Sequence, residues 1–279
     1  GDYFDETLKA ALEYSENTGA AMLPPFDHLD VIEGQASVGV EILNQLESPP
    51  DMIITPVGGG GLSSGLVKYF NSYEIQFKFC EPMGGRSLFQ SLKHKKLITL
   101  DYVDNFVDGA AVARIGDQNF NILKNQNIEN VLGIPEGRIC ATITEMLNIE
   151  GIVLEPAGAL AIDALKDIRD QIVGKTVVCI ASGGNFDFER LPDIKERALR
   201  FEGLKKYFIL RMPQRPGALK DFLNLLGPND DIARFEYLKK SARNFGSVLL
   251  GIESGSVQGF DELCKRMTDN GFSYEDITN

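Results

Sequence analysis

The segment DMIITPVGGGGLSSGLVKYF, residues 51–70, decides the fold of the longer, N-terminal part of this chain of 279 residues. It begins with a short β-rich apolar run, passes through four consecutive glycines, and continues into LSSGLVKYF, which is long enough for a helix. The segment IQFKFC, residues 75–80, is a second β-rich run. A strand, a helix and a strand in this order are typical of a βαβ unit, so a parallel sheet is expected.

The same alternation is expected to continue along residues 1–202. Helical periodicity predicts helices over residues 5–19, 30–46, 136–151, 158–170 and 191–200. The apolar run KTVVCIA, residues 175–181, is typical of a buried strand in a parallel sheet. Residues 1–202 are therefore predicted to form an α/β domain with a parallel sheet.

The pattern changes after residue 202. Strands are expected at 205–212, 232–240, 247–254 and 272–277, and helices at 217–227 and 260–271. Their order, βαββαβ, is that of a small ferredoxin-like α+β domain. Residues 203–279 are therefore predicted to form a second domain.

The composition narrows the possible partners and the location. The 28 Lys and Arg residues against 40 Asp and Glu give a net charge of −12 with no basic stripe, which argues against nucleic acid. No apolar run is long enough to span a membrane, and the acidic start GDYFDETLKAA is unlike a signal peptide. The four cysteines form no CxxC pair, which fits a reducing compartment. A cytoplasmic protein is expected.

The glycine run at residues 58–61 predicts an anion site. A strand that ends in glycines and leads into a helix presents bare NH groups together with the positive end of the helix dipole. Each hydrogen bond to a charged oxygen contributes about 1.5 to 3 kcal/mol net, so three or four of them can hold a phosphate without Lys or Arg. The alternative is a tight turn that needs glycine only for its backbone dihedrals, for which one glycine usually suffices.

Nucleotide motifs fit this run poorly. A Walker loop is excluded, because no GK[ST] follows at the required spacing. Gly58 and Gly60 match the first two glycines of the dinucleotide fingerprint, and Glu81 ends the next strand where a ribose-binding acid would stand. Ser63 occupies the third glycine position, so NAD binding is kept only as a rival interpretation.

A second glycine-rich turn, CIASGGN at residues 179–185, follows another expected strand. Turns at the carboxyl ends of two strands in one parallel sheet line a common crevice. The first turn is therefore expected to bind a phosphate, while the hydroxyl of Ser182 meets another part of the same ligand.

Five segments, taken together and in order, resemble the threonine dehydratase family. They are PPFDHLDVIEGQASVGVEIL at 24–43, TPVGGGGLSSG at 55–65, EPAGALA at 155–161, SGGN at 182–185 and MPQRPGALKDFLNLLG at 212–227. The first four resemble a pyridoxal-phosphate enzyme of the tryptophan-synthase β type, and the last resembles an ACT-like regulatory domain. The resemblance implies an enzyme of isoleucine biosynthesis that converts L-threonine to 2-oxobutanoate and ammonia.

The resemblance also implies which residues bind the cofactor, pyridoxal 5'-phosphate. In that family the glycine loop holds the phosphate, and Ser182 matches the partner of the pyridine nitrogen. A hydroxyl leaves the ring neutral and a weaker electron sink than a carboxylate would, which suits β-elimination. The cofactor-binding residues expected from the resemblance are Gly58, Gly59, Gly60, Gly61, Leu62, Gly109, Glu155 and Ser182.

Two acidic residues have alternative interpretations. Glu155 is expected near the cleft by resemblance, but a solvent-facing acid ahead of a helix that starts after Pro156 explains it equally well. Some relatives carry a cation beside the acid that matches Glu81. Arg86 and Ser87 stand where a second acid would be needed, so no metal is expected.

No lysine of the chain stands in the context that the family's chemistry requires. The cofactor-binding lysine of the family lies in a serine-x-lysine stretch N-terminal to the glycine loop. Lys9 and Lys68 fall on expected helices, residues 93–96 form a solvated basic patch, and His28 is expected in a loop rather than as a base. No catalytic residue is therefore assigned, and the chain is expected to be an inactive C-terminal part of the enzyme, whether the rest was removed or only omitted.

The loop PQRPGAL, residues 213–219, is the expected effector site. Pro216 and Gly217 end the strand, and the NH groups at the start of the next helix can bind an amino-acid carboxylate. The resemblance implies inhibition by isoleucine, opposed by valine. Because the chain contains one βαββαβ unit, the effector sites are expected to require a second subunit and hence a homo-oligomer. The candidate contacts are Arg215, Pro216, Gly217, Ala218, Leu219, Phe235 and Tyr237.

Two alternatives to this regulatory interpretation stay open at this point. The small domain can be a packing module without any ligand. The whole chain can also be a non-catalytic, amino-acid-binding regulatory module with a vestigial cofactor site.

Overall fold

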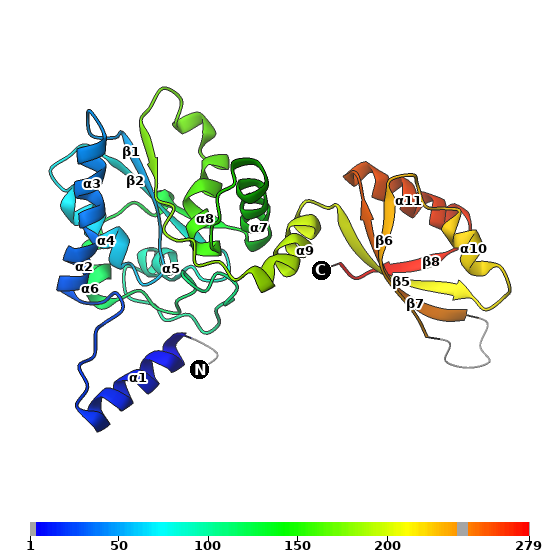
Figure 1. The fold of residues 1–279 in the computed structure, drawn as a ribbon, viewed down its shortest axis with the longest axis horizontal. Helices are drawn as coiled ribbons and strands as arrows, with labels where there is room; N and C mark the ends of the chain where they lie inside the picture. The colour runs from blue at the N-terminus through cyan, green and yellow to red at the C-terminus, as the bar shows by residue number, and fades with distance from the viewer. Residues whose placement is uncertain (1–3, 239–244, 279) are drawn as a thin grey trace. The chain divides into compact units, whose positions relative to one another are not determined.

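The computed structural model of this chain describes residues 4–238 and 245–278. The chain divides into two compact units, Gly1–Phe188 and Glu189–Asn279 (Figure 1). Each unit contains its own four-stranded sheet and its own cluster of buried apolar side chains. The two units are therefore described one at a time.

The first unit is built on a parallel sheet in the strand order β3-β2-β1-β4. The strands are β1 Met52–Pro56, β2 Gln76–Pro82, β3 Val131–Ile134 and β4 Val177–Cys179. The register places Ile53 beside Phe77 on one side and beside Val178 on the other. The predicted βαβ unit is confirmed, since β1, the helix after the glycines and β2 follow one another with parallel pairing.

Two details of this sheet differ from the sequence-based prediction. The strand β3 was not expected, because the four residues VLGI are too few for a periodic pattern. The strand β4 was expected to be buried, but its side chains are only half-buried. In the described sheet β4 pairs with β1 alone. It is therefore an edge strand, with a neighbouring strand on one side only.

The helices of the first unit follow the predicted positions with some interruptions. They are α1 Phe4–Thr18, α2 Leu29–Gln35, α3 Ser37–Gln45, α4 Gly61–Tyr69, α5 Ser87–His94, α6 Asp117–Leu123, α7 Glu136–Glu145 and α8 Pro156–Asp163. The single helix expected over 30–46 is divided at Ala36, and the pattern after α7 continues as a π-helix, Met146–Glu150. Neither α5 nor α6 was predicted.

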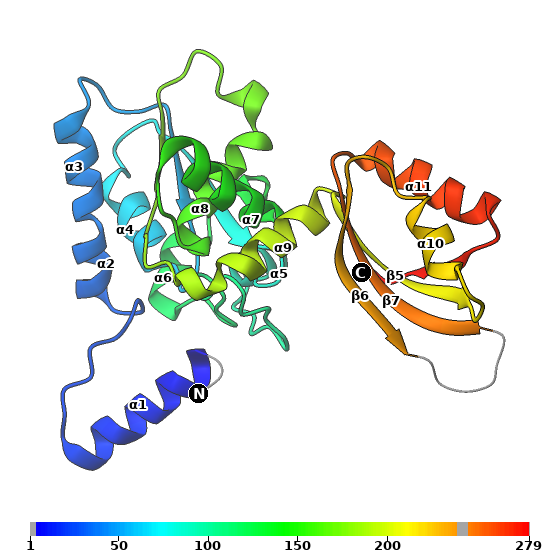
Figure 2. The same cartoon turned by 45° about the vertical axis from the view of Figure 1, so that its right-hand side comes forward.

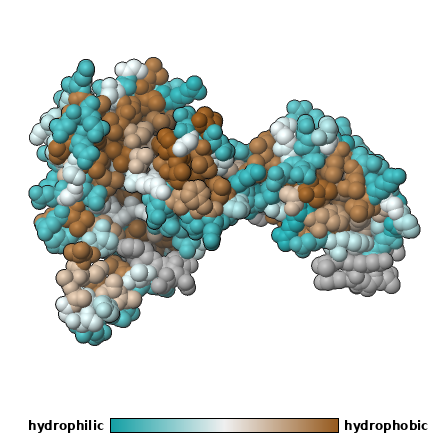
Figure 3. Space-filling model, in the orientation of Figure 1, coloured by the Kyte–Doolittle hydropathy of each residue, from teal (hydrophilic) through white to brown (hydrophobic). Residues whose placement is uncertain are grey.

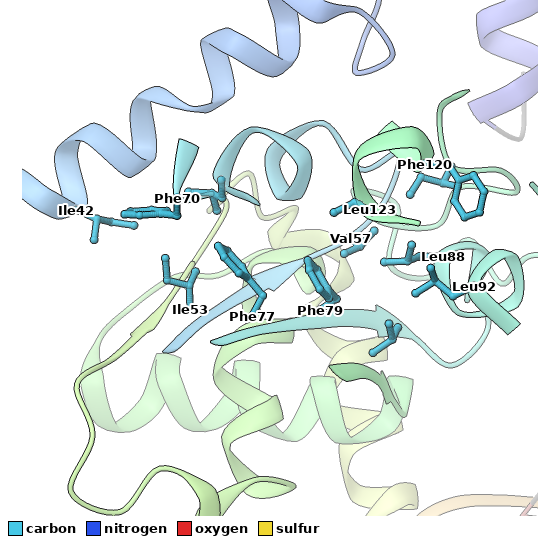
Figure 4. Close-up of a cluster of buried hydrophobic side chains, with 13 residues drawn as sticks. Ile42, Ile53, Val57, Phe70, Phe77, Phe79, Leu88, Leu92, Phe120 and Leu123 are labelled. Carbon is cyan, nitrogen blue, oxygen red and sulfur yellow. The ribbon is translucent and has the colours of Figure 1, made fainter. Parts of the chain in front are cut away.

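Helices cover both faces of the parallel sheet. Figures 1 and 2 show α2, α3 and α4 on one side and α7 and α8 on the other. Between the sheet and α4, Ile53, Phe70, Phe77 and Phe79 belong to one buried cluster (Figure 4). Each fully buried side chain of this size contributes about 1.5–3 kcal/mol to folding. The cluster fixes α4, and with it the glycine loop, against β1.

The second unit contains an antiparallel sheet in the order β6-β7-β5-β8. Its elements are α9 Leu191–Phe201, β5 Lys205–Pro213, α10 Ala218–Leu223, β6 Asp230–Leu238, β7 Phe245–Ser254, α11 Val257–Asp269 and β8 Ser273–Asp276. Phe222 of α10 and Phe260 of α11 are buried with Phe208 and Leu250 of the sheet. The predicted βαββαβ domain is confirmed. Lys239 and Lys240, expected at the end of β6, lie outside the described residues.

The boundary between the units lies ahead of α9, not after residue 202 as predicted. The carboxylate of Glu196 on α9 lies 2.5 Å from Lys205 Nζ and accepts a hydrogen bond of 2.7 Å from the Tyr207 hydroxyl. Ile194 and Ala198, on the same helix, are buried. The helix α9 therefore packs on β5. The amphipathic pattern of α9 predicts a buried face but does not indicate which sheet that face covers.

The face drawn in Figure 3 mixes hydrophilic and hydrophobic residues over both units. Within residues 4–238 and 245–278, no helix is long and apolar enough to cross a bilayer.

We predict that Gly65→Ala destabilises the first unit. A Cβ atom at Gly65 on α4 would lie 2.6 Å from the carbonyl oxygen of Ile32 and 2.8 Å from the amide nitrogen of Ala36, so two helix backbones would have to separate. Such overpacking costs about 1–3 kcal/mol. The control is Gly34→Ala on α2, where a Cβ meets nothing within 4 Å. That change should stabilise the unit by roughly 0.5–1 kcal/mol. Equal effects of both substitutions in urea unfolding would contradict the prediction.

Candidate active site

The four glycines form a loop that is packed closely on several sides. A Cβ atom at Gly58 would lie 3.1 Å from Ala110 Cα, one at Gly59 would overlap the Phe26 ring, and one at Gly60 would lie 2.9 Å from Ile115 Cδ1. Gly60 also has a φ of +91°, which side chains rarely adopt. A turn that needed glycine for its dihedrals alone would not require it at Gly58 and Gly59.

The loop presents its backbone NH groups without using them. Within the described residues, none of the NH groups of residues 58–62 donates a hydrogen bond to the protein. The next two residues do have partners, since the Ser63 hydroxyl donates to the Pro56 carbonyl at 3.0 Å and the Ser64 NH to the Gly60 carbonyl at 2.9 Å. Because unpaired NH groups at a helix start attract anions, this loop fits a phosphate group.

Residues 58–62 all line a cavity of about 220 Å³. The two predicted turns share it, and its lining consists of Pro25, Phe26, Val31, Gln35, Pro56, Gly58, Gly59, Gly60, Gly61, Leu62, Gly109, Ala110, Ala157 and Ser182. Seven of the eight residues expected from the sequence line this cavity. Residues of the PPFD turn and of α2 also line the cavity, and none of them was expected as a site residue, although their segment was part of the resemblance.

Glu155, the eighth expected residue, lies beside the cavity. A Cβ atom at Gly183 would overlap its carboxylate, and one at Gly109 would lie 3.7 Å from its Oε1. Burial raises the pKa of Glu155, and the nearby Asp108 raises it further, although the NH of Asn185 acts in the opposite direction. Glu155 is thus half-buried beside Gly183 of the second turn and Gly109, rather than turned fully to solvent.

Glu81 has a structural role and does not face the cavity. Its side chain is fully buried at the end of β2 and accepts hydrogen bonds from the NH groups of Leu88 (2.7 Å) and Phe89 (2.9 Å) at the start of α5. Burial raises the pKa of Glu81 to about 7, against the lowering effect of these two bonds and of Arg86. A ribose-binding role for Glu81 is therefore wrong.

No group of three or more His, Cys, Asp or Glu side chains in residues 4–238 and 245–278 is arranged to hold a metal ion. In the same part of the chain, no lysine lines the cavity. His28, expected in a loop, precedes α2 and caps it by accepting the NH of Asp30 at Nδ1 (3.2 Å).

A second cavity, of about 610 Å³, lies in the second unit between β5, α10 and β6. Its lining is Met212, Pro213, Gln214, Arg215, Pro216, Gly217, Ala218, Leu219, Lys220, Leu223, Phe235 and Tyr237, which includes all seven residues expected at the effector site. The Arg215 guanidinium lies 2.6 Å from the Asp221 carboxylate. The cavity thus combines an apolar wall with a cation beside it.

The parallel sheet and the glycine loop define a class of enzyme. Residues 1–183 match the family of pyridoxal-phosphate dependent enzymes, and residues 196–279 match the C-terminal regulatory domain of threonine dehydratase. The chain belongs to the pyridoxal-phosphate-dependent enzymes, so the rival interpretation as an NAD site is overturned. Pyridoxal phosphate is the cofactor, and the unused NH groups of residues 58–62 fit its phosphate.

Individual relatives narrow the class further. L-threonine dehydratase biosynthetic IlvA of Halalkalibacterium halodurans is 44% identical over 280 residues, covering 99% of this chain and 67% of that protein. The protein of the same name from Bacillus subtilis is 45% identical over 280 residues, covering 99% and 66%. The chain is a member of the biosynthetic threonine dehydratase family with a regulatory domain. It spans about two thirds of the length of these relatives.

Solved structures agree with this assignment. The processed form of threonine deaminase isoform 2 from Solanum lycopersicum superposes with a TM-score of 0.64 at 36% identity, covering 70% of this chain and 57% of that one. The serine racemase from Dictyostelium discoideum gives a TM-score of 0.57 at 30% identity, covering 66% and 60%. The predicted fold class is confirmed.

We predict that Glu81→Gln removes part of the pH dependence of stability. The pKa of Glu81 is raised from 4.5 to about 7 by folding, so the folded chain loses stability as the pH rises through this interval and the buried group ionises. Urea unfolding at pH 5 and pH 8 should show a smaller loss for the variant. At pH 5 the variant should be less stable by about 1–3 kcal/mol, because one NH loses its acceptor.

Glu136→Gln provides the matched control for this measurement. The Glu136 carboxylate also accepts a backbone NH, from Gly84 at 2.7 Å, but its side chain is only half-buried. This variant removes an acceptor of one backbone NH but keeps the Glu81 carboxyl, so its stability at pH 5 and pH 8 is the reference against which Glu81→Gln is compared. The same pH dependence in Glu81→Gln would refute the burial argument.

Proposed function

We propose that these 279 residues supply the cofactor cup and the regulatory domain of an enzyme that converts L-threonine to 2-oxobutanoate and ammonia. The observation that carries this proposal is the set of unused NH groups at residues 58–62, which line one cavity together with Ser182. The family membership supports the choice of pyridoxal phosphate as the ligand. The bound cofactor supplies an electron sink that acidifies the Cα proton of an amino acid and lets a β-hydroxyl leave.

Each expected site residue has a task that its surroundings support. The NH groups of residues 58–62 bind the phosphate and the positive end of α4 adds to their effect. The Ser182 hydroxyl offers a neutral hydrogen-bond partner to the ring nitrogen. The cofactor ring then stays neutral and is a weaker electron sink than it would be beside a carboxylate. Gly109 lines the cavity and packs against Ala157, since a Cβ there would lie 2.9 Å from Ala157 Cβ. Glu155, with its raised pKa, can hold a proton beside Gly109 and Gly183.

The cup lacks a nucleophile within the part of the chain that the structure describes. No lysine lines the cavity there, and the buried Lys78 donates a hydrogen bond to Asn130 Oδ1 at 3.0 Å. We therefore propose that residues 1–279 alone bind the cofactor without turning threonine over. A lysine from outside these residues would complete the site.

A binding and trapping experiment tests this proposal. Pyridoxal phosphate should bind residues 1–279 in competition with inorganic phosphate, because the phosphate supplies most contacts. After reduction with borohydride, mass spectrometry should find no pyridoxal-phosphate adduct on a lysine whose amount falls when inorganic phosphate is added. Threonine should give no 2-oxobutanoate. Adducts that phosphate does not suppress serve as the control for surface lysines. Turnover, or a phosphate-sensitive adduct on one lysine, would contradict the proposal.

The cavity of the second unit is proposed to bind isoleucine, with valine as a competitor. Met212, Leu219 and Phe235 offer an apolar surface for a branched side chain, and Arg215 offers a cation for the carboxylate. These residues favour a ligand site over a packing module without a ligand. The homo-oligomeric state and the cytoplasmic location that were expected from the sequence stay predictions.

We predict that Arg215→Ala weakens isoleucine binding roughly tenfold or more, the effect of losing one hydrogen bond to a charged group. Isothermal titration of the full chain measures this affinity. Arg234→Ala is the matched control, because Arg234 lies on β6, pairs with Glu236 at 2.7 Å and does not line the cavity. If both variants bind isoleucine alike, Arg215 is not the carboxylate partner.

A further inference from the structure

The turn formed by Phe26 and Asp27 is fastened to a distant part of the chain. The Asp27 carboxylate accepts hydrogen bonds from the NH groups of Asp117 (2.9 Å) and Gln118 (2.8 Å), which start α6 some 90 residues later. The contact is close, since a Cβ atom at Gly116 would lie 2.6 Å from Asp27 Cγ. Asp27 therefore caps α6 in place of a side chain from the helix's own N-cap residue, Gly116.

The same turn lies directly on the glycine loop. The Phe26 ring occupies the space that a side chain of Gly59 would need, and Phe26 Cβ would lie 3.2 Å from a Cβ at Gly61. The Phe26 carbonyl accepts a hydrogen bond of 3.1 Å from Nδ2 of Asn119 on α6. The Asn119 side chain is buried, and its Oδ1 has no partner among the described residues. Within those residues, the bond to the Phe26 carbonyl is therefore the hydrogen bond that the Asn119 side-chain amide makes.

The first turn of α6 also contacts the loop without the help of Phe26. The NH of Gly116 donates to the carbonyl of Gly59 at 3.1 Å. Asn119 and Ile115 fill the space beside Gly60. The loop is thus enclosed by two segments, the turn and the start of α6, and Asp27 joins these two segments to each other.

A loop of four glycines needs such an external support. Glycine loses more backbone freedom than any other residue when it is ordered, and a ligand that had to order the loop would bind weakly. A loop that is already ordered, with its NH groups directed at one ligand position, avoids this loss of backbone entropy on binding. We propose that the turn of Phe26 and Asp27 is a positioning element of the phosphate site: Asp27 anchors it to α6, and Phe26 holds the glycine loop in its ligand-binding conformation.

This role differs from that of an ordinary helix cap, and the chain offers a matched control. Asp51 also accepts a backbone NH from a remote segment, that of Thr176 at 2.7 Å across 125 residues. It precedes β1, at the opposite end of that strand from the glycine loop. Removing either carboxylate costs stability, but only Asp27 should affect binding of a phosphate ester.

The test measures the dissociation constants of pyridoxal phosphate and of pyridoxal, which lacks the phosphate, with the full chain. Asp27→Ala should weaken binding of pyridoxal phosphate about tenfold or more and leave that of pyridoxal unchanged. Asp51→Ala should bind both as the unmodified chain does. Asp27→Asn, which keeps one acceptor, should recover part of the affinity. Phe26→Leu, which keeps the anchor and removes the ring, should also weaken pyridoxal phosphate binding.

Amide hydrogen exchange gives a second readout that needs no cofactor. In Asp27→Ala the amide of Gly116 should exchange faster, because its acceptor belongs to the glycine loop. Unchanged exchange at Gly116, unchanged affinity for pyridoxal phosphate, or an equal loss in Asp51→Ala would overturn the positioning role. This inference rests on the proposed phosphate cup. If the unmodified chain binds pyridoxal phosphate no better than pyridoxal, that cup fails, while the exchange at Gly116 still decides the positioning role.

Discussion

The constraint on which the site depends is the close approach of backbone and side chains around the glycine loop. Phe26, Ala110 and Ile115 lie so near to Gly58, Gly59 and Gly60 that no side chain fits between them. This packing replaces the hydrogen bonds that a loop normally makes to itself, and it leaves the NH groups of residues 58–62 unused. An anion is the ligand that such a loop can recognise without any basic residue.

The core beneath the loop makes this arrangement possible. The buried side chains of Phe70, Phe77 and Phe79 hold α4 and β2 together, so the first turn of α4 has a fixed position above the end of β1. The second glycine turn follows β4, the neighbour of β1 on the other side. Ser182 reaches the same cavity for this reason, since parallel strands end on one edge of the sheet. The regulatory unit needs no such sheet edge, because its cavity forms between β5, α10 and β6.

Sequence reasoning succeeded where a local pattern carried the information. The β1-α4-β2 unit, the βαββαβ order of the second unit and the shared cavity of the two glycine turns were all expected from residue patterns. It failed for β3, whose four residues are too short to be periodic, and for α9, whose apolar face does not say which sheet it covers. The rival interpretation of Glu81 as a ribose-binding acid arose because a buried carboxylate that caps α5 looks in the sequence like any acid at the end of a strand.

The sequence by itself determined that the chain has a parallel α/β unit followed by a ferredoxin-like unit, and it predicted an anion site at the glycine run. These conclusions depend on periodicity and on backbone freedom, which are local properties of a few residues. Only the tertiary structure decided that Phe26 lies on Gly59 and that Asp27 caps α6, since these contacts join segments that are far apart in the sequence, about ninety residues in the case of Asp27. No local pattern encodes such a pairing, because it results from how the sheet brings the two segments together.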